Sequence, residues 1–139
     1  MSLLVMKFGG TSLASTDLIK EAAERVKAQV LLGYEVVVIV SAMSGKTNEL
    51  VGWVNDTSSM YDAREYDAVV SSGEQVTAGL MALVLQELDV PARSWLGWQV
   101  PLKTKGSHGA ARIKDISTEN INQKFSEGMK VAVIAGFQG

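Results

Sequence analysis

Glu35-Val36-Val37-Val38-Ile39-Val40 is the clearest β-strand in this sequence. Five of its residues are β-branched, so the strand is apolar on both faces. Such a run is typical of a central parallel strand that helices cover on both sides. It therefore predicts an open α/β sheet, and the segments on either side can be interpreted outward from it.

The segment before this strand predicts a second strand and a connecting helix. Leu3–Phe8 is a short apolar run that suits a buried strand. Ser15-Thr16-Asp17 offers helix N-caps, apolar residues then recur at helical spacing, and Gly33 is a good helix terminator. Because such crossovers are right-handed, the two strands are expected to be parallel, with their carboxyl ends at one edge of the sheet.

The segment after this strand predicts further alternation of helices and strands. The expected elements are helices over 48–54 and 62–88, short strands within 90–102, an exposed strand over 111–116, a helix across Ile121 and Phe125, and a strand over 130–135. We expect an interruption of the second helix at Ser71-Ser72-Gly73. It would place Glu74 in the first turn of a buried helix, where the helix dipole favours a carboxylate.

Composition limits the function classes that this chain can serve. With 139 residues and 47% hydrophobic content it can bury one core. A net charge of −2 and the lack of a basic stripe argue against a nucleic-acid partner. With no cysteine and one histidine, neither a disulfide nor a thiolate or histidine metal site is expected. No signal segment and no run of 18 apolar residues is present, which favours a cytoplasmic protein without a membrane partner.

The first strand ends in a pattern that suits a phosphate. In Val5–Ser12, a lysine and two glycines stand where the strand gives way to a hydroxyl-rich turn. Glycines let backbone N–H groups point at an anion, and Lys7 supplies a positive charge beside them. Ser41 follows the second strand and is expected at the same edge, where open α/β sheets bind ligands.

Gly45-Lys46-Thr47 imitates the end of a different phosphate-binding motif, the P-loop. That motif requires a glycine five residues before Gly45, and Val40 stands there. A P-loop is therefore not expected.

Four segments together resemble the aspartokinases, members of the amino acid kinase family. They are Val5–Ser12, Ser41–Asn48, Ser71–Val76 and Ala135–Gly139, in the family's order and spread over the whole chain. The resemblance implies an αβα sandwich with a mainly parallel sheet. It also implies phosphoryl transfer from MgATP to the side-chain carboxylate of L-aspartate, giving 4-phospho-L-aspartate, with ATP and Mg²⁺ as cofactors.

The resemblance also assigns roles at the phosphate. Lys7 matches the family's catalytic, phosphate-contacting lysine, and Gly9 and Gly10 match its glycine loop. Ser41 matches a serine beside the phosphates or the substrate. The alternatives are a surface lysine at a strand end for Lys7 and a helix cap for Ser41.

At the substrate, the resemblance assigns three residues. Glu74 would accept hydrogen bonds from the ammonium of aspartate, Thr47 would bond a carboxylate, and Phe137 would line the pocket. The alternatives are a first-turn carboxylate without a ligand for Glu74, a helix cap for Thr47 and a core position for Phe137.

Aspartokinases continue beyond the last matching segment into the part that binds adenine and ribose and into regulatory domains. We therefore expect residues 1–139 to be the N-terminal, substrate-binding part of a catalytic domain, inactive alone, in a protein that forms a homo-oligomer. The resemblance implies a role at the entry to lysine, threonine and methionine biosynthesis.

Two alternatives stay open. One is another amino acid kinase that acts on glutamate, acetylglutamate, carbamate or UMP, although Glu74 suits a free amino group, which UMP lacks. The other is a non-catalytic module whose sheet edge and apolar helix face pair with a second copy.

Overall fold

The computed structural model describes residues 2–96, 102–105, 112–116 and 119–136, with side chains described in 2–96 and 119–136. The main sheet has four parallel strands in the order β1-β2-β6-β3. Their bounds are β1 Leu3–Phe8, β2 Glu35–Val40, β3 Ala92–Trp95 and β6 Val131–Ala135. The strand that the sequence predicts to be central, β2, therefore lies inside the sheet, with β1 on one side and β6 on the other.

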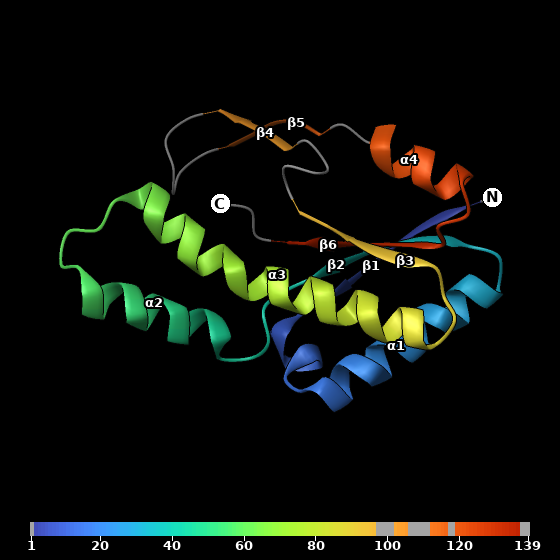
Figure 1. Cartoon of the computed structure of the whole chain (residues 1–139), viewed down its shortest axis with the longest axis horizontal. Coiled ribbons are helices and arrows are strands. Elements are labelled where there is room, and N and C mark those ends of the chain that lie inside the picture. The colour runs from blue at the N-terminus through green and yellow to red at the C-terminus, as the bar shows by residue number, and fades with distance from the viewer. Residues whose placement is uncertain (1, 97–101, 106–111, 117–118, 137–139) are drawn as a thin grey trace.

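Helices cover both faces of this sheet (Figure 1). The helices are α1 Thr16–Leu31, α2 Lys46–Thr57, α3 Ala63–Glu87 and α4 Glu119–Ser126. The helices α1 and α3 pack on one face through a continuous core of buried side chains that includes Ile19, Val26, Met81 and Leu85. A smaller cluster of Trp95, Ile121, Phe125 and Ala132 joins α4 to the opposite face. The expected αβα sandwich is confirmed.

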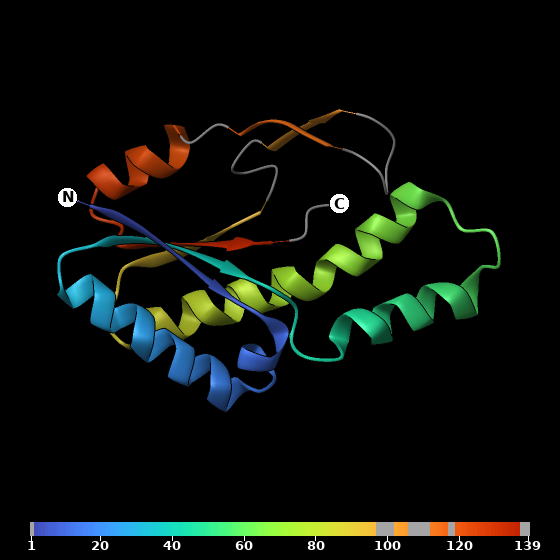
Figure 2. The ribbon, with the colours of Figure 1, turned by 180° about the vertical axis from the view of Figure 1, so that it is seen from behind.

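A hairpin and a helix lie outside this three-layer arrangement. A hairpin of β4 Leu102–Lys105 and β5 Arg112–Ile116 forms a separate antiparallel pair on the side of the sheet that carries α4 (Figure 1). The helix α2 packs on the first half of α3, and the two helices extend beyond the end of the sheet (Figure 2). The sheet edge with the predicted site is the one that faces this helical pair.

The helix α1 begins and ends where the sequence predicts. The hydroxyl of Ser15 accepts a hydrogen bond from the backbone N–H of Leu18 at 3.2 Å. At the other end Gly33 has a φ of +101°, a conformation that side chains disfavour. These two residues set the length of the crossover between β1 and β2.

The expected interruption of α3 is wrong, because the helix runs unbroken through Ser71-Ser72-Gly73. A Cβ on Gly73 would lie 3.1 Å from Leu50 Cδ1 and 3.2 Å from Ala42 Cβ. The small residues therefore allow α2 to approach α3 closely. Glu74 consequently lies in the middle of α3, where the dipole of a helix N-terminus gives its carboxylate no support.

By length and composition alone, α3 could also cross a membrane. Its most apolar 18-residue window has a mean hydropathy of 1.4, and half of that window is buried inside the protein. The buried half forms the contact with the sheet, as in any core helix of an α/β protein.

Candidate functional site

Three loops meet at the carboxyl edge of the main sheet. Phe8 is in register with Val40 of β2, and Val40 is in register with Ala135 of β6. The residues that follow these strand ends are therefore neighbours at the edge, although they are far apart in sequence. This arrangement is the one that the predicted site requires.

The glycine loop after β1 packs against the loop after β2. Residues Gly10–Leu13 form a 3-10 turn, and the fully buried Leu13 holds it to the core. A Cβ on Gly10 would lie 3.0 Å from the carbonyl oxygen of Ala42, so a larger residue would push the two loops apart. A Cβ on Gly9 would meet nothing within 4 Å. The backbone at Gly9 is thus open to an approaching anion.

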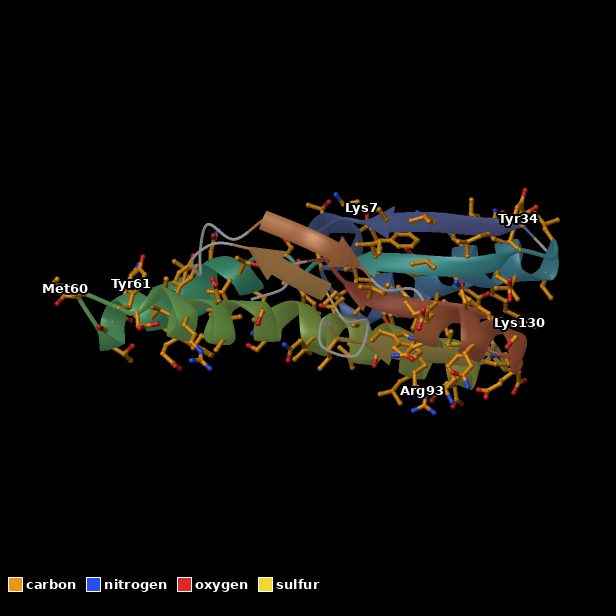
Figure 3. All side chains as sticks on the ribbon, turned by 90° about the horizontal axis from the view of Figure 1, so that it is seen from above. Lys7, Tyr34, Met60, Tyr61, Arg93 and Lys130 are labelled. Atoms are coloured by element: carbon orange, nitrogen blue, oxygen red, sulfur yellow. The ribbon has the colours of Figure 1, made fainter. Side chains whose placement is uncertain are left out.

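Lys7 lies beside this loop on an exposed part of β1. Figure 3 shows it at the end of the sheet that faces the α2–α3 pair, while Tyr34 lies at the opposite end. Lys7 makes no ion pair with any residue in the described part of the chain. Its ammonium group is therefore available for a phosphate oxygen.

A carboxylate reaches the same edge from α3. The backbone N–H of Gly136 donates to the carbonyl oxygen of Val40 at 2.9 Å, which fixes the start of the loop after β6. A Cβ on Gly136 would lie 3.2 Å from that carbonyl oxygen and 3.9 Å from Oε1 of Glu74. The half-buried carboxylate of Glu74 therefore lies above the ends of β2 and β6.

The start of α2 brings Thr47 to this region. The N-cap of α2 is Gly45, whose φ of +81° turns the chain into the helix without a side-chain cap. Thr47 lies in the first turn and is exposed. A Cβ on Gly73 would lie 3.3 Å from Cγ of Lys46, so the residue before Thr47 packs against the residue before Glu74.

The alternative of helix capping is wrong for both hydroxyl residues after β2. Neither Ser41 nor Thr47 caps α2, because Gly45 holds the N-cap position. Ser41 is half-buried directly after β2, next to the buried Ala42 that contacts Gly10 and Gly73. It is therefore placed at the junction of the glycine loop with α3.

The ammonium group of Lys46 lies along α2 instead of crossing to the glycine loop. Its Nζ is 3.2 Å from both carboxylate oxygens of Glu49. This is an exposed pair on one helix surface.

Phe137, the remaining predicted site residue, lies outside the described residues. The interpretation of the sequence missed Gly136 as a site residue. A Gly directly after the apolar run 131–135 was the available signal, since a Cβ there would crowd the carbonyl oxygen of Val40 at 3.2 Å.

The described residues contain no group of three His, Cys, Asp or Glu side chains that could hold a metal ion. The arrangement places the open backbone at Gly9 and the exposed Lys7 after and within β1, and the carboxylate of Glu74 above the ends of β2 and β6. It suits a ligand that carries an anionic group and a separate ammonium group.

Known proteins with similar sequences are aspartokinases. An aspartokinase of Rickettsia felis is 46% identical over 142 residues, covering 100% of this chain and 35% of that protein. Aspartokinase 2 of Bacillus subtilis is 44% identical over 139 residues, covering 100% of this chain and 34% of that protein. The chain thus spans about a third of the length of the curated relatives it matches.

Solved structures agree with the fold. Aspartate kinase from Synechocystis has a TM-score of 0.80 at 39% identity, over 99% of this chain and 22% of that chain. Aspartokinase III of E. coli, in complex with aspartate and ADP, has a TM-score of 0.80 at 19% identity, over 98% of this chain and 41% of that chain. The sequence matches the amino acid kinase family across residues 2–139. This chain therefore belongs to the amino acid kinase family.

Proposed function

We propose that residues 1–139 form the phosphate- and aspartate-binding part of an aspartate kinase. The reaction is transfer of the γ-phosphoryl group of MgATP to the side-chain carboxylate of L-aspartate, which gives 4-phospho-L-aspartate. The single observation that carries this proposal is the meeting of three loops at one sheet edge. There the glycine loop contacts Ala42, and Gly136 lies beside Glu74.

In this proposal Lys7, Gly9 and Gly10 hold the transferring phosphate. Phosphoryl transfer depends mainly on positioning and on neutralising the charge of the transition state. The ammonium of Lys7, which has no ion-pair partner among the described residues, and the open backbone at Gly9 suit that role. Ser41 would donate a hydrogen bond to a phosphate or to the substrate, and its half-buried position directly after β2 supports this role.

Substrate recognition falls to the opposite side of the site. Glu74 accepts hydrogen bonds from the ammonium group of aspartate, and Thr47 bonds one of its carboxylates. A carboxylate that binds an amino group discriminates strongly between ligands, because a ligand without that group loses a charge-assisted hydrogen bond. We place Phe137 at the same pocket from its position directly after Gly136.

Mg²⁺ would bind chiefly through the phosphate oxygens of ATP, since the described residues offer no metal-binding group of their own. When bound, it neutralises charge on the phosphates. Adenine and ribose binding belongs to sequence that the longer relatives have beyond the matched third. We further propose a cytoplasmic homo-oligomer that acts at the entry to lysine, threonine and methionine biosynthesis.

The first test is ligand binding by the isotope-labelled chain, followed in amide NMR spectra. L-aspartate and then L-glutamate would be titrated with and without MgATP. We expect shifts for Thr47, Glu74 and Gly136 with L-aspartate and weaker ones with L-glutamate. Well-dispersed spectra that respond to neither amino acid would refute the proposed substrate site.

A chimera tests catalysis directly. The matching N-terminal third of Bacillus subtilis aspartokinase 2 would be replaced by this chain, which is 44% identical to it over all 139 residues. We expect aspartate-dependent ATP turnover by the chimera and none when Lys7 is changed to Met. A folded chimera that turns over glutamate better than aspartate would assign the chain to another substrate of the family.

A further inference from the structure

A hollow of about 240 Å³ lies between α2 and α3. The two helices run side by side beyond the end of the sheet (Figure 2). We call this cavity the α2–α3 hollow. It is lined by side chains of both helices and of the loop before α2, namely Met43, Lys46, Leu50, Trp53, Ser72, Gly73 and Val76.

The lining of the α2–α3 hollow is mostly apolar. Trp53 and Val76 are 54% and 57% exposed, and they supply apolar surface together with Met43 and Leu50. An apolar cavity of about 150 Å³ in another protein binds benzene, so a volume near 240 Å³ has room for one ring and a short side chain. Trp53 offers the indole surface on which such a ring packs.

Lys46 is the only charged residue among those that line the hollow. Its Nζ lies 3.2 Å from a carboxylate oxygen of Glu49, and the two side chains are 40% and 44% exposed. An exposed pair of this kind is weak, and a lysine ammonium has three N–H donors. The hydroxyl of Ser72 already donates to the carbonyl oxygen of Val69 at 2.6 Å. Lys46 is therefore the group in the hollow that can hold an anion.

We propose that the α2–α3 hollow binds a small aromatic carboxylate. The ring packs against Trp53 and Val76, and the carboxylate accepts a hydrogen bond from the ammonium group of Lys46. A flat surface, such as a membrane, would touch the exposed Trp53 and Val76 but would leave the recess between the helices empty. A small ligand fills the recess and also meets its one charge.

The hollow adjoins the proposed aspartate site without being part of it. Gly73 and Lys46 line the hollow, and they directly precede Glu74 and Thr47 in the sequence. Because Val76 follows Glu74 by two residues, the two side chains point to opposite sides of α3. A ligand in the hollow therefore contacts neighbours of the two residues that we propose to bind L-aspartate, but not the aspartate itself.

The packing at Gly73 indicates the direction of the coupling. A Cβ on Gly73 would lie 3.1 Å from Cδ1 of Leu50 and 3.3 Å from Cγ of Lys46, so α2 cannot move closer to α3 at this point. A ligand between the helices can only move α2 away. This step rests on the proposed function: the movement separates Thr47 from Glu74 and weakens the binding of L-aspartate. By linkage, L-aspartate weakens the binding of the carboxylate equally.

The first test titrates phenylacetate into the ¹⁵N-labelled chain. The chain has three tryptophans, whose indole N–H signals can be followed in amide NMR spectra, and Trp53→Phe identifies the signal of Trp53. Phenylacetate should shift this signal to saturation, whereas phenethylamine, which joins the same ring to a positive charge, should not. A Trp53 signal that ignores millimolar phenylacetate overturns the proposal.

Two variants test where the probe binds. Lys46→Met should weaken the binding of phenylacetate about tenfold and leave that of the neutral phenylacetamide unchanged. Lys20→Met, at an exposed position of α1, is the matched control. Ser72→Phe places a ring in the hollow and should abolish the binding of both compounds. Unchanged phenylacetate binding by either K46M or S72F overturns the proposed site.

The coupling is tested by titrating L-aspartate with and without saturating phenylacetate. We expect the affinity for L-aspartate to fall at least about fivefold. An unchanged affinity overturns the coupling. Failure of the proposed function gives a different result, in which L-aspartate does not bind even without phenylacetate while the probe still shifts the signal of Trp53.

The other occupants of the hollow give distinct results. A Trp53 signal that changes with protein concentration and ignores phenylacetate would show that a second copy of the chain fills the hollow. A signal that broadens only with phospholipid vesicles would assign the surface to a membrane. Either result overturns the proposal.

Discussion

At the scale of single residues, the position of Glu74 is the most informative feature of the site. Its carboxylate lies 3.9 Å from a Cβ built on Gly136, at the meeting point of three loops. A sequence motif assigns Glu74 a ligand, and the geometry explains how a residue in mid-helix reaches the sheet edge. The role that the resemblance gives Glu74 stays a prediction, while its expected place in a first turn was wrong.

Changing Glu74 to Gln should remove a charged acceptor without removing the side chain. A hydrogen bond between charged groups contributes about 1.5–3 kcal/mol, so L-aspartate binding should weaken by roughly ten- to a hundredfold. Isothermal titration would measure this change, with Glu87→Gln on the same helix as the matched control. Equal losses in both variants would show a general effect of charge instead of a direct contact.

Changing Lys7 to Met should separate phosphate binding from folding. Because Lys7 is exposed and unpaired among the described residues, the free energy of unfolding should change by less than about 0.5 kcal/mol. Binding of MgATP should weaken at least about tenfold if the lysine contacts a phosphate. Titration of the nucleotide measures this, with Lys20→Met on α1 as control. Unchanged MgATP binding would leave Lys7 as a surface lysine.

At the scale of elements, local sequence signals correctly predicted the two ends of α1 but wrongly predicted a break in α3. Ser15 caps the start of α1 and Gly33 ends it, and both act within their own turns. Such local roles can be recognised from the sequence. Ser71-Ser72-Gly73 looks like a helix break because small residues weaken helices locally. Its actual role depends on Leu50 and Ala42, which approach from elsewhere in the chain. Such tertiary contacts cannot be read from a local pattern.

Two glycines allow a paired test at this scale. Gly33 has a φ of +101°, so Gly33→Ala should destabilise the protein by about 1 kcal/mol. Gly52 lies inside α2 with nothing within 4 Å of an added Cβ, so Gly52→Ala should stabilise it by about 0.4–1 kcal/mol. Urea unfolding measures both changes. Effects of the same sign would contradict the assigned backbone conformations.

At the scale of the whole molecule, stability depends on the face of α3 that meets the sheet. Met81 is fully buried in the main core, whereas Met60 is 93% exposed at the corner between α2 and α3 (Figure 3). Met81→Ala should therefore lower the free energy of unfolding by about 2–5 kcal/mol, and Met60→Ala by less than about 0.5 kcal/mol. Chemical denaturation of the two variants checks this. Similar losses would show that the helical corner is also part of the core.

The general architecture could be predicted because β-branched runs such as 35–40 mark buried parallel strands wherever they occur. The strand order was not predicted, since a strand's place in a sheet depends on which neighbours pack together. The pairing of the backbone N–H of Gly136 with Val40 is a result of that order. Position 137 was named from the motif and lies outside the described residues, so its role stays a prediction.

The strand order also bears on how the chain folds as a ribosome makes it. The strand β6 lies between β2 and β3, yet it is synthesised last of the strands in the described part of the chain. Until Val131–Ala135 emerges, β2 has a partner on one side only and β3 has none. The nascent chain therefore exposes the two strand edges that β6 later occupies, one on β2 and one on β3. Contacts between such distant segments form slowly, and unpaired edges promote aggregation during that interval. Protection of nascent chains by a chaperone should therefore matter most just before β6 emerges from the ribosome.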